Sequence, residues 1–151
     1  MLALCYGWQM TILEIQNNFI AEFSKLATWE ERYQHVIALG KTLPPFPEDK
    51  RTESNKVKGC QSQVWMHAHF VDGKVKYHID SDAMIVKGLA AILYQTFNAQ
   101  NPSDILAASM DFLEKIGFTS HLSQSRANGL AAMARQFKNY ALVFQTLQKT
   151  R

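Results

Sequence analysis

The strongest β-strand signal in the chain lies at residues 64–79, which read VWMHAHFV-DG-KVKYHI. Asp72-Gly73 at its centre is typical of a two-residue hairpin turn, and apolar residues alternate imperfectly with polar ones on both sides. We therefore expect an antiparallel hairpin with strands over residues 64–71 and 74–79. Because a hairpin alone is barely stable in water, we also expect a third short strand, for which residues 55–58 are the candidate.

Two helices are expected before the hairpin. Apolar residues recur at spacings of three and four over residues 12–26, which is typical of an amphipathic helix. Thr28 and Glu31 form the sequence pattern of a capping box, which predicts the start of a second helix that Gly40 would end. The prolines that follow cannot lie inside a helix, so residues 41–54 should form a surface loop.

Helices are also expected after the hairpin. Ser81 or Asp82 would cap a helix over residues 83–97, which is apolar on nearly all sides and should be the central buried helix. Gly88 inside this helix indicates close packing against another backbone. Three further helices should follow, at residues 102–107, 111–116 and 123–148. The order of helices, hairpin and helices predicts an α+β domain with a small three-stranded antiparallel sheet and helices packed against it.

Length and composition limit the possible functions. The chain has 151 residues, of which 47% are hydrophobic and 19% charged, as in an ordinary single globular domain. Its net charge of +3 comes from scattered lysines and arginines, so nucleic-acid binding is not expected. No run reaches the ~18 apolar residues that a membrane span needs. Two distant cysteines, Cys5 and Cys60, and the lack of a secretion signal favour the reducing cytoplasm.

The first nine residues read as an extension of the domain. They are apolar, but they lack the positively charged start and the cleavage site of a signal peptide. Met10 opens a stretch that resembles a normal N-terminus leading into a helix, so we expect it to be the true first residue. The expected organisation is an extension over residues 1–9, which contains Cys5, and one domain over residues 10–151.

Cys60 is the candidate functional residue, and its sequence context allows two interpretations. Free cysteine is among the most buried residue types, so a place in the core is one interpretation. The glycine before it and the polar Gln61, Ser62 and Gln63 after it favour a reachable thiol instead. A reactive cysteine must be accessible and partly ionised, and the sequence does not reveal what would lower its pKa.

Two other uses of this cysteine are poorly supported. Cys60, His67 and His69 could be imagined as metal ligands, but the chain lacks the paired-cysteine and paired-histidine spacings of zinc or iron–sulfur sites, so no metal is expected. A cysteine hydrolase needs a base oriented by a third group, and the five histidines form no such motif. Asp82 as a helix cap and Arg126 as a surface charge have adequate structural explanations.

Four blocks of the sequence resemble the SufE family of sulfur-acceptor proteins, which includes the CsdE branch. They occur in the family's order over most of the chain: Trp29–Tyr33 with Leu39–Pro44, Val57–Trp65, Asp80–Leu89 and His121–Leu130. The Gly-Cys-Gln-Ser-Gln-Val-Trp block is the most specific. Its Gln61-Ser62-Gln63 run is more similar to SufE proper than to the CsdE branch.

The resemblance implies a fold like that of IscU-type scaffolds and a function for Cys60. This cysteine would accept sulfur from the persulfide of a PLP-dependent cysteine desulfurase of the SufS or CsdA type, stimulating that enzyme. It would then deliver the sulfur to a SufBCD-type iron–sulfur assembly complex. The protein itself would be a carrier rather than an enzyme, without PLP, metal or any other cofactor, and either a monomer or a homodimer.

The resemblance also implies supporting roles for Asp82 and Arg126, which match family positions near the Cys60 loop. We expect the loop to tuck Cys60 under apolar side chains at rest and to swing out on docking. Asp82 would hold the resting position, and Arg126 would stabilise the thiolate or the persulfide. Two alternatives remain: an activator that tunes a desulfurase without carrying sulfur, and a thiol-based redox sensor.

Overall fold

The computed structural model of the chain describes residues 9–150. Its hairpin is confirmed, because β1 (Val64–Val71) pairs antiparallel with β2 (Lys74–Ser81), with Val71 opposite Lys74. Asp72 and Gly73 have φ angles of 53° and 76°, as a type I′ turn requires at both central positions. The expected extension over residues 1–9 lies outside the described residues except for residue 9, so its separation from a domain over residues 10–151 stays a prediction.

The prediction of a third strand is wrong. Within residues 9–150 the sheet has two strands, and the candidate segment adds one isolated bridge between Lys56 and Trp65. The chain cannot stay along the sheet edge, because η2 (Glu53–Asn55) curls into a 3₁₀ turn before the bridge and Gly59 turns the backbone away after it, with a φ of 94°. Helices packed against the hairpin supply the support that a third strand would give.

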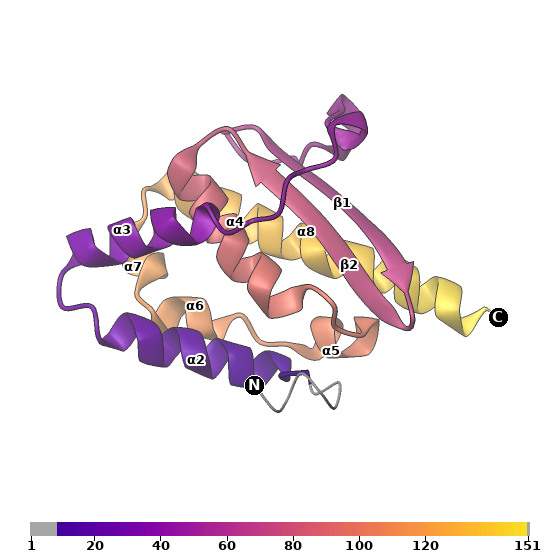
Figure 1. Cartoon of the computed structure of the whole chain (residues 1–151), viewed down its shortest axis with the longest axis horizontal. Helices are drawn as coiled ribbons and strands as arrows, with labels where there is room; N and C mark the ends of the chain where they lie inside the picture. The colour runs from indigo at the N-terminus through magenta and orange to yellow at the C-terminus, as the bar shows by residue number, and fades with distance from the viewer. Residues whose placement is uncertain (1–8, 151) are drawn as a thin grey trace.

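Helices cover the inner face of the hairpin (Figure 1). The central helix α4 (Met84–Phe97) packs on β2, and α8 (Gln124–Lys149) packs on α4. Around them lie the remaining helices, α2 (Ile12–Ser24), α3 (Trp29–Gly40), α5 (Pro102–Ala107), α6 (Asp111–Lys115) and α7 (Phe118–His121). The α+β class is therefore confirmed. None of the helices within residues 9–150 is long and apolar enough to cross a membrane.

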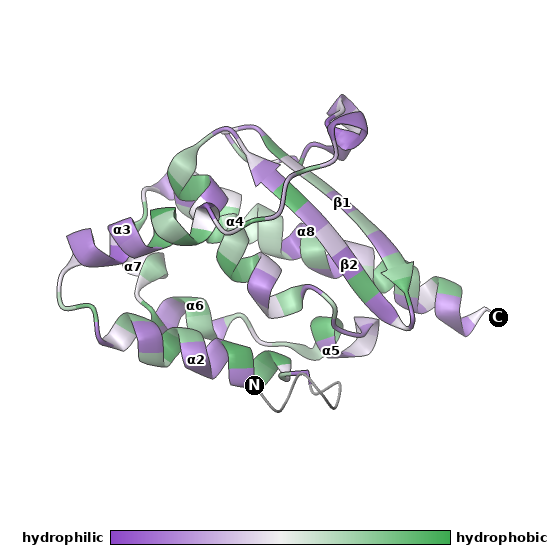
Figure 2. Cartoon of the chain, in the orientation of Figure 1, coloured by the Kyte–Doolittle hydropathy of each residue, from purple (hydrophilic) through white to green (hydrophobic). Residues whose placement is uncertain are grey.

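β2 shows the alternation that a half-buried sheet needs, and β1 follows it except at the buried Trp65 (Figure 2). Val64, Met66 and Ala68 of β1 are buried toward the helices, and Tyr77 of β2 is fully buried with its hydroxyl donating to Phe137 O at 2.7 Å. On the outer face Trp65 is covered by the loop that follows α3, which contains η1 (Glu48–Lys50). This loop therefore lies on the surface, as expected, and wraps the fold by packing on the sheet.

Two expected helix caps are corrected by the structure. Gly40 does not end α3 in a left-handed conformation; a Cβ on it would lie 2.9 Å from the backbone nitrogen of Gly88, so it serves the close crossing of α3 and α4. The N-cap of α4 is Ala83, and neither Ser81 nor Asp82 takes that position. Ser81 Oγ accepts from Ala83 N at 3.2 Å, whereas the Asp82 carboxylate is engaged elsewhere.

We expect Gly88→Ala to destabilise the fold. The added Cβ would lie 2.2 Å from Val36 O, so α3 and α4 must separate. This overpacking costs about 1–3 kcal/mol and outweighs the better helix propensity of alanine. Urea unfolding measures the change in the free energy of unfolding. Gly129→Ala is the matched control, since its Cβ meets Cys60 Sγ at an ordinary 3.6 Å; equal stability of both variants would refute the close-crossing argument.

Candidate functional site

Cys60 lies half-buried in the loop before β1 (residues 59–63, the Cys60 loop), with its side chain against α8. Its thiol donates to the backbone carbonyl of Gly129 with an Sγ–O distance of 3.6 Å. Gly59 permits this contact, because it takes a positive φ and its ideal Cβ position lies only 3.3 Å from Ala132 Cβ. Cys60 thus combines partial packing against the core with access to the surface. The sequence presents these two positions as alternatives.

A cavity of about 200 Å³ adjoins the thiol. Its wall comes from the Cys60 loop, from α4 and from α8, and it is mostly apolar on the α4 side. The lining side chains and backbone belong to Cys60, Gln61, Ser62, Val86, Leu89, Ser125, Arg126, Gly129, Leu130 and Met133. A water molecule takes roughly 30 Å³ in the liquid, so the space exceeds what one added atom of similar size requires.

Burial raises the pKa of the Cys60 thiol above its ordinary value. Removing the sulfur from water disfavours the thiolate, and no charge on the described residues offsets this effect. The thiol is therefore protonated near neutral pH in this position, as its hydrogen bond to Gly129 O also requires. A protonated thiol is a poor nucleophile, so the observed conformation is a protected one.

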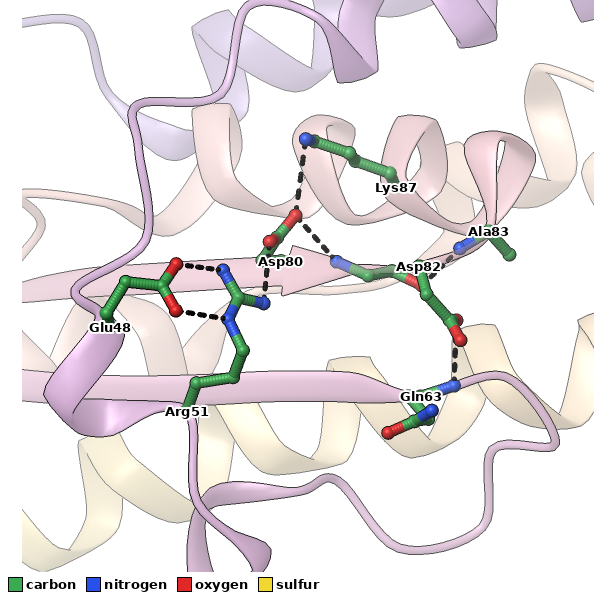
Figure 3. A network of polar contacts seen from close by, with 8 residues as sticks. Glu48, Arg51, Gln63, Asp80, Asp82, Ala83 and Lys87 are labelled. Atoms are coloured by element: carbon green, nitrogen blue, oxygen red, sulfur yellow. Dashed lines mark hydrogen bonds and ion pairs between the residues drawn. The ribbon is translucent and has the colours of Figure 1, made fainter.

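Asp82 fastens the far end of the Cys60 loop (Figure 3). Gln63 N donates to Asp82 Oδ1 at 3.0 Å, and Asp82 N donates to Gln63 O at 3.3 Å. The two contacts join the residue before β1 to the junction between β2 and α4. Both residues are exposed, so this clamp is accessible to water and to any docking partner.

A second polar group beside the clamp was missed by the sequence reasoning. The Asp80 carboxylate forms ion pairs with Arg51 at 2.9 Å and Lys87 at 3.2 Å, and it accepts from Ser81 N at 2.9 Å. Burial opposes ionisation of Asp80, but these hydrogen bonds outweigh it and lower its pKa. Arg51 also pairs with Glu48 at 3.1 Å (Figure 3), so the loop after α3, the end of β2 and α4 are joined.

Arg51 adds an aromatic contact to this group. Its guanidinium carbon lies 4.8 Å from the centre of the Trp65 ring and 5.1 Å from that of Phe46. The loop that follows α3 therefore packs on the outer face of the sheet just where the Cys60 loop ends and β1 begins. The sequence contains both partners, Arg51 and the Asp80-Ser81-Asp82 block. No spacing rule connects positions so far apart, so their contact could not be predicted.

Arg126 lines the same cavity as Cys60, and its guanidinium bonds to Tyr33 rather than to the thiol. It lies in the first turns of α8, and its Nη1 donates to the Tyr33 hydroxyl at 3.2 Å. Of the three predicted site residues, the structure therefore places Arg126 and Cys60 on one cavity and Asp82 at the end of the loop. Tyr33 is a further residue that sequence reasoning did not associate with the site.

Three of the five histidines, His67, His69 and His78, form a separate group on the outer face of the hairpin. His78 stacks with His69 at 5.5 Å and with His67 at 6.3 Å between ring centres, whereas Cys60 faces α8. Burial lowers the pKa values of His67 and His78, assisted by neighbouring positive charges. Within residues 9–150 no cluster of three or more histidine, cysteine or acidic side chains is arranged to hold a metal ion. Cys5 lies outside the described residues.

Comparisons with known proteins agree on one family. A family model for SufE, described as an iron–sulfur metabolism associated domain, matches residues 17–141. A SufE-like protein of Rhizobium meliloti is 44% identical over 130 residues, covering 83% of this chain and 93% of its own. A SufE-like protein of Rhizobium etli is 41% identical over 132 residues, covering 84% and 89%.

More distant relatives extend the agreement to the fold. A SufE-like protein of Synechocystis is 39% identical over 126 residues, covering 83% of this chain and 79% of its own. The solution structure of a hypothetical protein from Thermus thermophilus superposes with a TM-score of 0.73 at 23% identity, covering 87% of this chain and 96% of that one. The chain belongs to the SufE family, whose domain is associated with iron–sulfur metabolism.

Proposed function

We propose that the protein carries sulfur as a persulfide on Cys60. It would take sulfane sulfur from the persulfide of a PLP-dependent cysteine desulfurase of the SufS or CsdA type. It would deliver that sulfur to a SufBCD-type iron–sulfur assembly complex in the cytoplasm. The observation that carries the proposal is a free thiol on the wall of a cavity with room for one more sulfur atom. Membership of the SufE family supports it.

The transfer follows thiol–disulfide exchange chemistry. The Cys60 thiol loses its proton, and the thiolate attacks the outer sulfur of the desulfurase persulfide. A new sulfur–sulfur bond forms on Cys60 while the one on the desulfurase breaks, and the desulfurase cysteine leaves as a thiolate that takes up a proton. One sulfur atom changes carrier without net oxidation or reduction. The protein needs no bound PLP or cluster for this step.

The attack requires the Cys60 loop to leave its resting position. Burial raises the pKa of the thiol, so the thiolate forms more readily once the sulfur reaches water or the partner's site. Gly59, with its positive φ, is a suitable pivot at one end, and the exposed Asp82 clamp can open at the other. After loading, return to the cavity would shield the persulfide from cellular thiols.

The two alternatives make different demands on this site. A peroxide sensor needs an accessible cysteine of low pKa, which the half-buried Cys60 with its raised pKa does not provide at rest. An activator that carries no sulfur would not need a cavity beside the thiol. It is distinguished by experiment, because it would retain its effect on the desulfurase after Cys60 is replaced.

Incubation with a SufS-type desulfurase and cysteine should add about 32 Da, one sulfur atom, to the protein. Intact mass should show the addition in wild type and in Cys5→Ser, and not in Cys60→Ser, with peptide mapping to Cys60. The Cys60→Ser variant should also lose stimulation of sulfide release. Full stimulation by this variant would favour the activator, and a Cys5-dependent addition would contradict the carrier role of Cys60.

Alkylation of Cys60 by iodoacetamide should depend on pH in a way that reports the resting loop. In a Cys5→Ser background, the rate should rise with pH through a midpoint above that of a free cysteine, because burial raises the pKa. Asp82→Ala removes the acceptor for Gln63 N, so the midpoint should fall and the neutral-pH rate should increase about three- to tenfold. Asp111→Ala on α6 is the control; matching profiles in all three would exclude a clamp at Asp82.

Arg126→Ala should weaken the loaded state. We assign Arg126 to the anionic persulfide, since burial and not a cation governs the pKa of the resting thiol. The variant should accept sulfur about tenfold more slowly or lose it correspondingly faster to glutathione, as expected for loss of a charge-assisted contact. Time-resolved intact mass measures both rates, and Arg135→Ala on the same helix is the control. Unchanged acceptance and retention would remove Arg126 from the site.

A further inference from the structure

The block Trp29-Glu30-Glu31-Arg32-Tyr33 at the start of α3 has no role in the proposed transfer. Trp29 stacks on His121 with 4.2 Å between ring centres and meets Phe118 edge-on at 5.8 Å. Both partners belong to α7, which leads directly into α8. The first turn of α3 is thus packed against the segment that sets the start of α8.

Arg32 fixes the same turn by hydrogen bonds. Its Nε donates to Leu26 O at 3.1 Å, and its Nη1 donates to Ile116 O at 3.3 Å at the end of α6. The capping box of Thr28 and Glu31 closes the helix start from the other side. The backbone that carries Tyr33 is therefore held by contacts to α6 and α7, independently of the Cys60 loop.

Tyr33 is the member of the block that reaches the cavity residues. Its ring packs edge-on against Trp29 at 5.5 Å, and its hydroxyl accepts from Arg126 Nη1 at 3.2 Å. The direction of the bond is certain, because a guanidinium has no acceptor. Arg126 is exposed and would otherwise sample many rotamers, so a fixed acceptor selects those that keep its charge at the edge of the cavity.

On the basis of the proposed function, we propose that Tyr33 is a positioning residue that holds the Arg126 guanidinium at the Cys60 cavity for the loaded state. Among the described residues that line this cavity, Arg126 is the one cation. The resting thiol does not need it, because it donates its proton to Gly129 O. A persulfide anion has no proton to donate there, so its terminal sulfur gains by turning toward Arg126.

Tyr33→Phe tests this role, since it keeps the ring contact with Trp29 and removes the hydroxyl alone. The Cys60 persulfide should be lost to glutathione about three- to tenfold faster than in wild type, as expected for the loss of one solvent-exposed hydrogen bond. In an Arg126→Ala background the same substitution should have no further effect, because Tyr33 acts through Arg126. Intact mass follows the loss of the added sulfur in all four proteins.

Tyr94→Phe is the matched control. The Tyr94 hydroxyl accepts from Asn98 Nδ2 at 3.2 Å and lines a different groove, so its removal should leave persulfide loss unchanged. Thermal unfolding and alkylation of the unloaded thiol should also be the same in Tyr33→Phe and wild type. Wild-type retention in Tyr33→Phe, or an equal loss in the Arg126→Ala background, would overturn the positioning role. Failure of wild type to gain sulfur at Cys60 would instead overturn the carrier function, and this inference with it.

Discussion

The crossing of α3 and α4 at Gly88 constrains the rest of the molecule. Val36 O lies so close to this glycine that no other residue fits without separating the helices. The flanking turn of α4 supplies Val86 and Leu89 to the Cys60 cavity, and α4 also supports the hairpin through β2. The helix that backs the thiol is therefore positioned by a backbone contact, which cannot adjust as a side-chain contact can.

The contacts around Cys60 differ in strength: some fix the end of β2, and others can break. The Asp80 carboxylate is largely buried, with 18% of its side chain exposed, and two cations and a backbone amide satisfy it. Breaking such a group leaves a buried charge without a partner and is costly. The Asp82 clamp is exposed to solvent, and the Cys60 hydrogen bond to Gly129 is a weak thiol contact that is only partly buried. In the proposed transfer, the strand end would therefore stay in place while the loop opens.

Local features of this fold could be predicted from the sequence, and features made by distant contacts could not. Asp72-Gly73 and the capping box at Thr28 act through neighbouring backbone groups, so their patterns were sufficient. The prediction of a third strand is wrong because Gly59 turns the chain away. The positive φ of Gly59 places Cys60 and does not extend the sheet. Asp82 was assigned as a cap by the same local logic, although its carboxylate bonds to Gln63.

The cavity is lined by three segments that no spacing rule connects. The sequence alone therefore could not decide whether Cys60 is a core residue or a reactive thiol. The structure gives the cavity two different poles: the Gly129 carbonyl, which favours a protonated sulfur, and Arg126, which favours an anionic one. If the protein carries sulfur as proposed, its empty and loaded forms would prefer different positions of the sulfur within one site. In the proposed transfer, adding a sulfur atom would exchange a weak hydrogen bond for an electrostatic contact, and the cavity would then favour the loaded protein over the empty one without binding any further group.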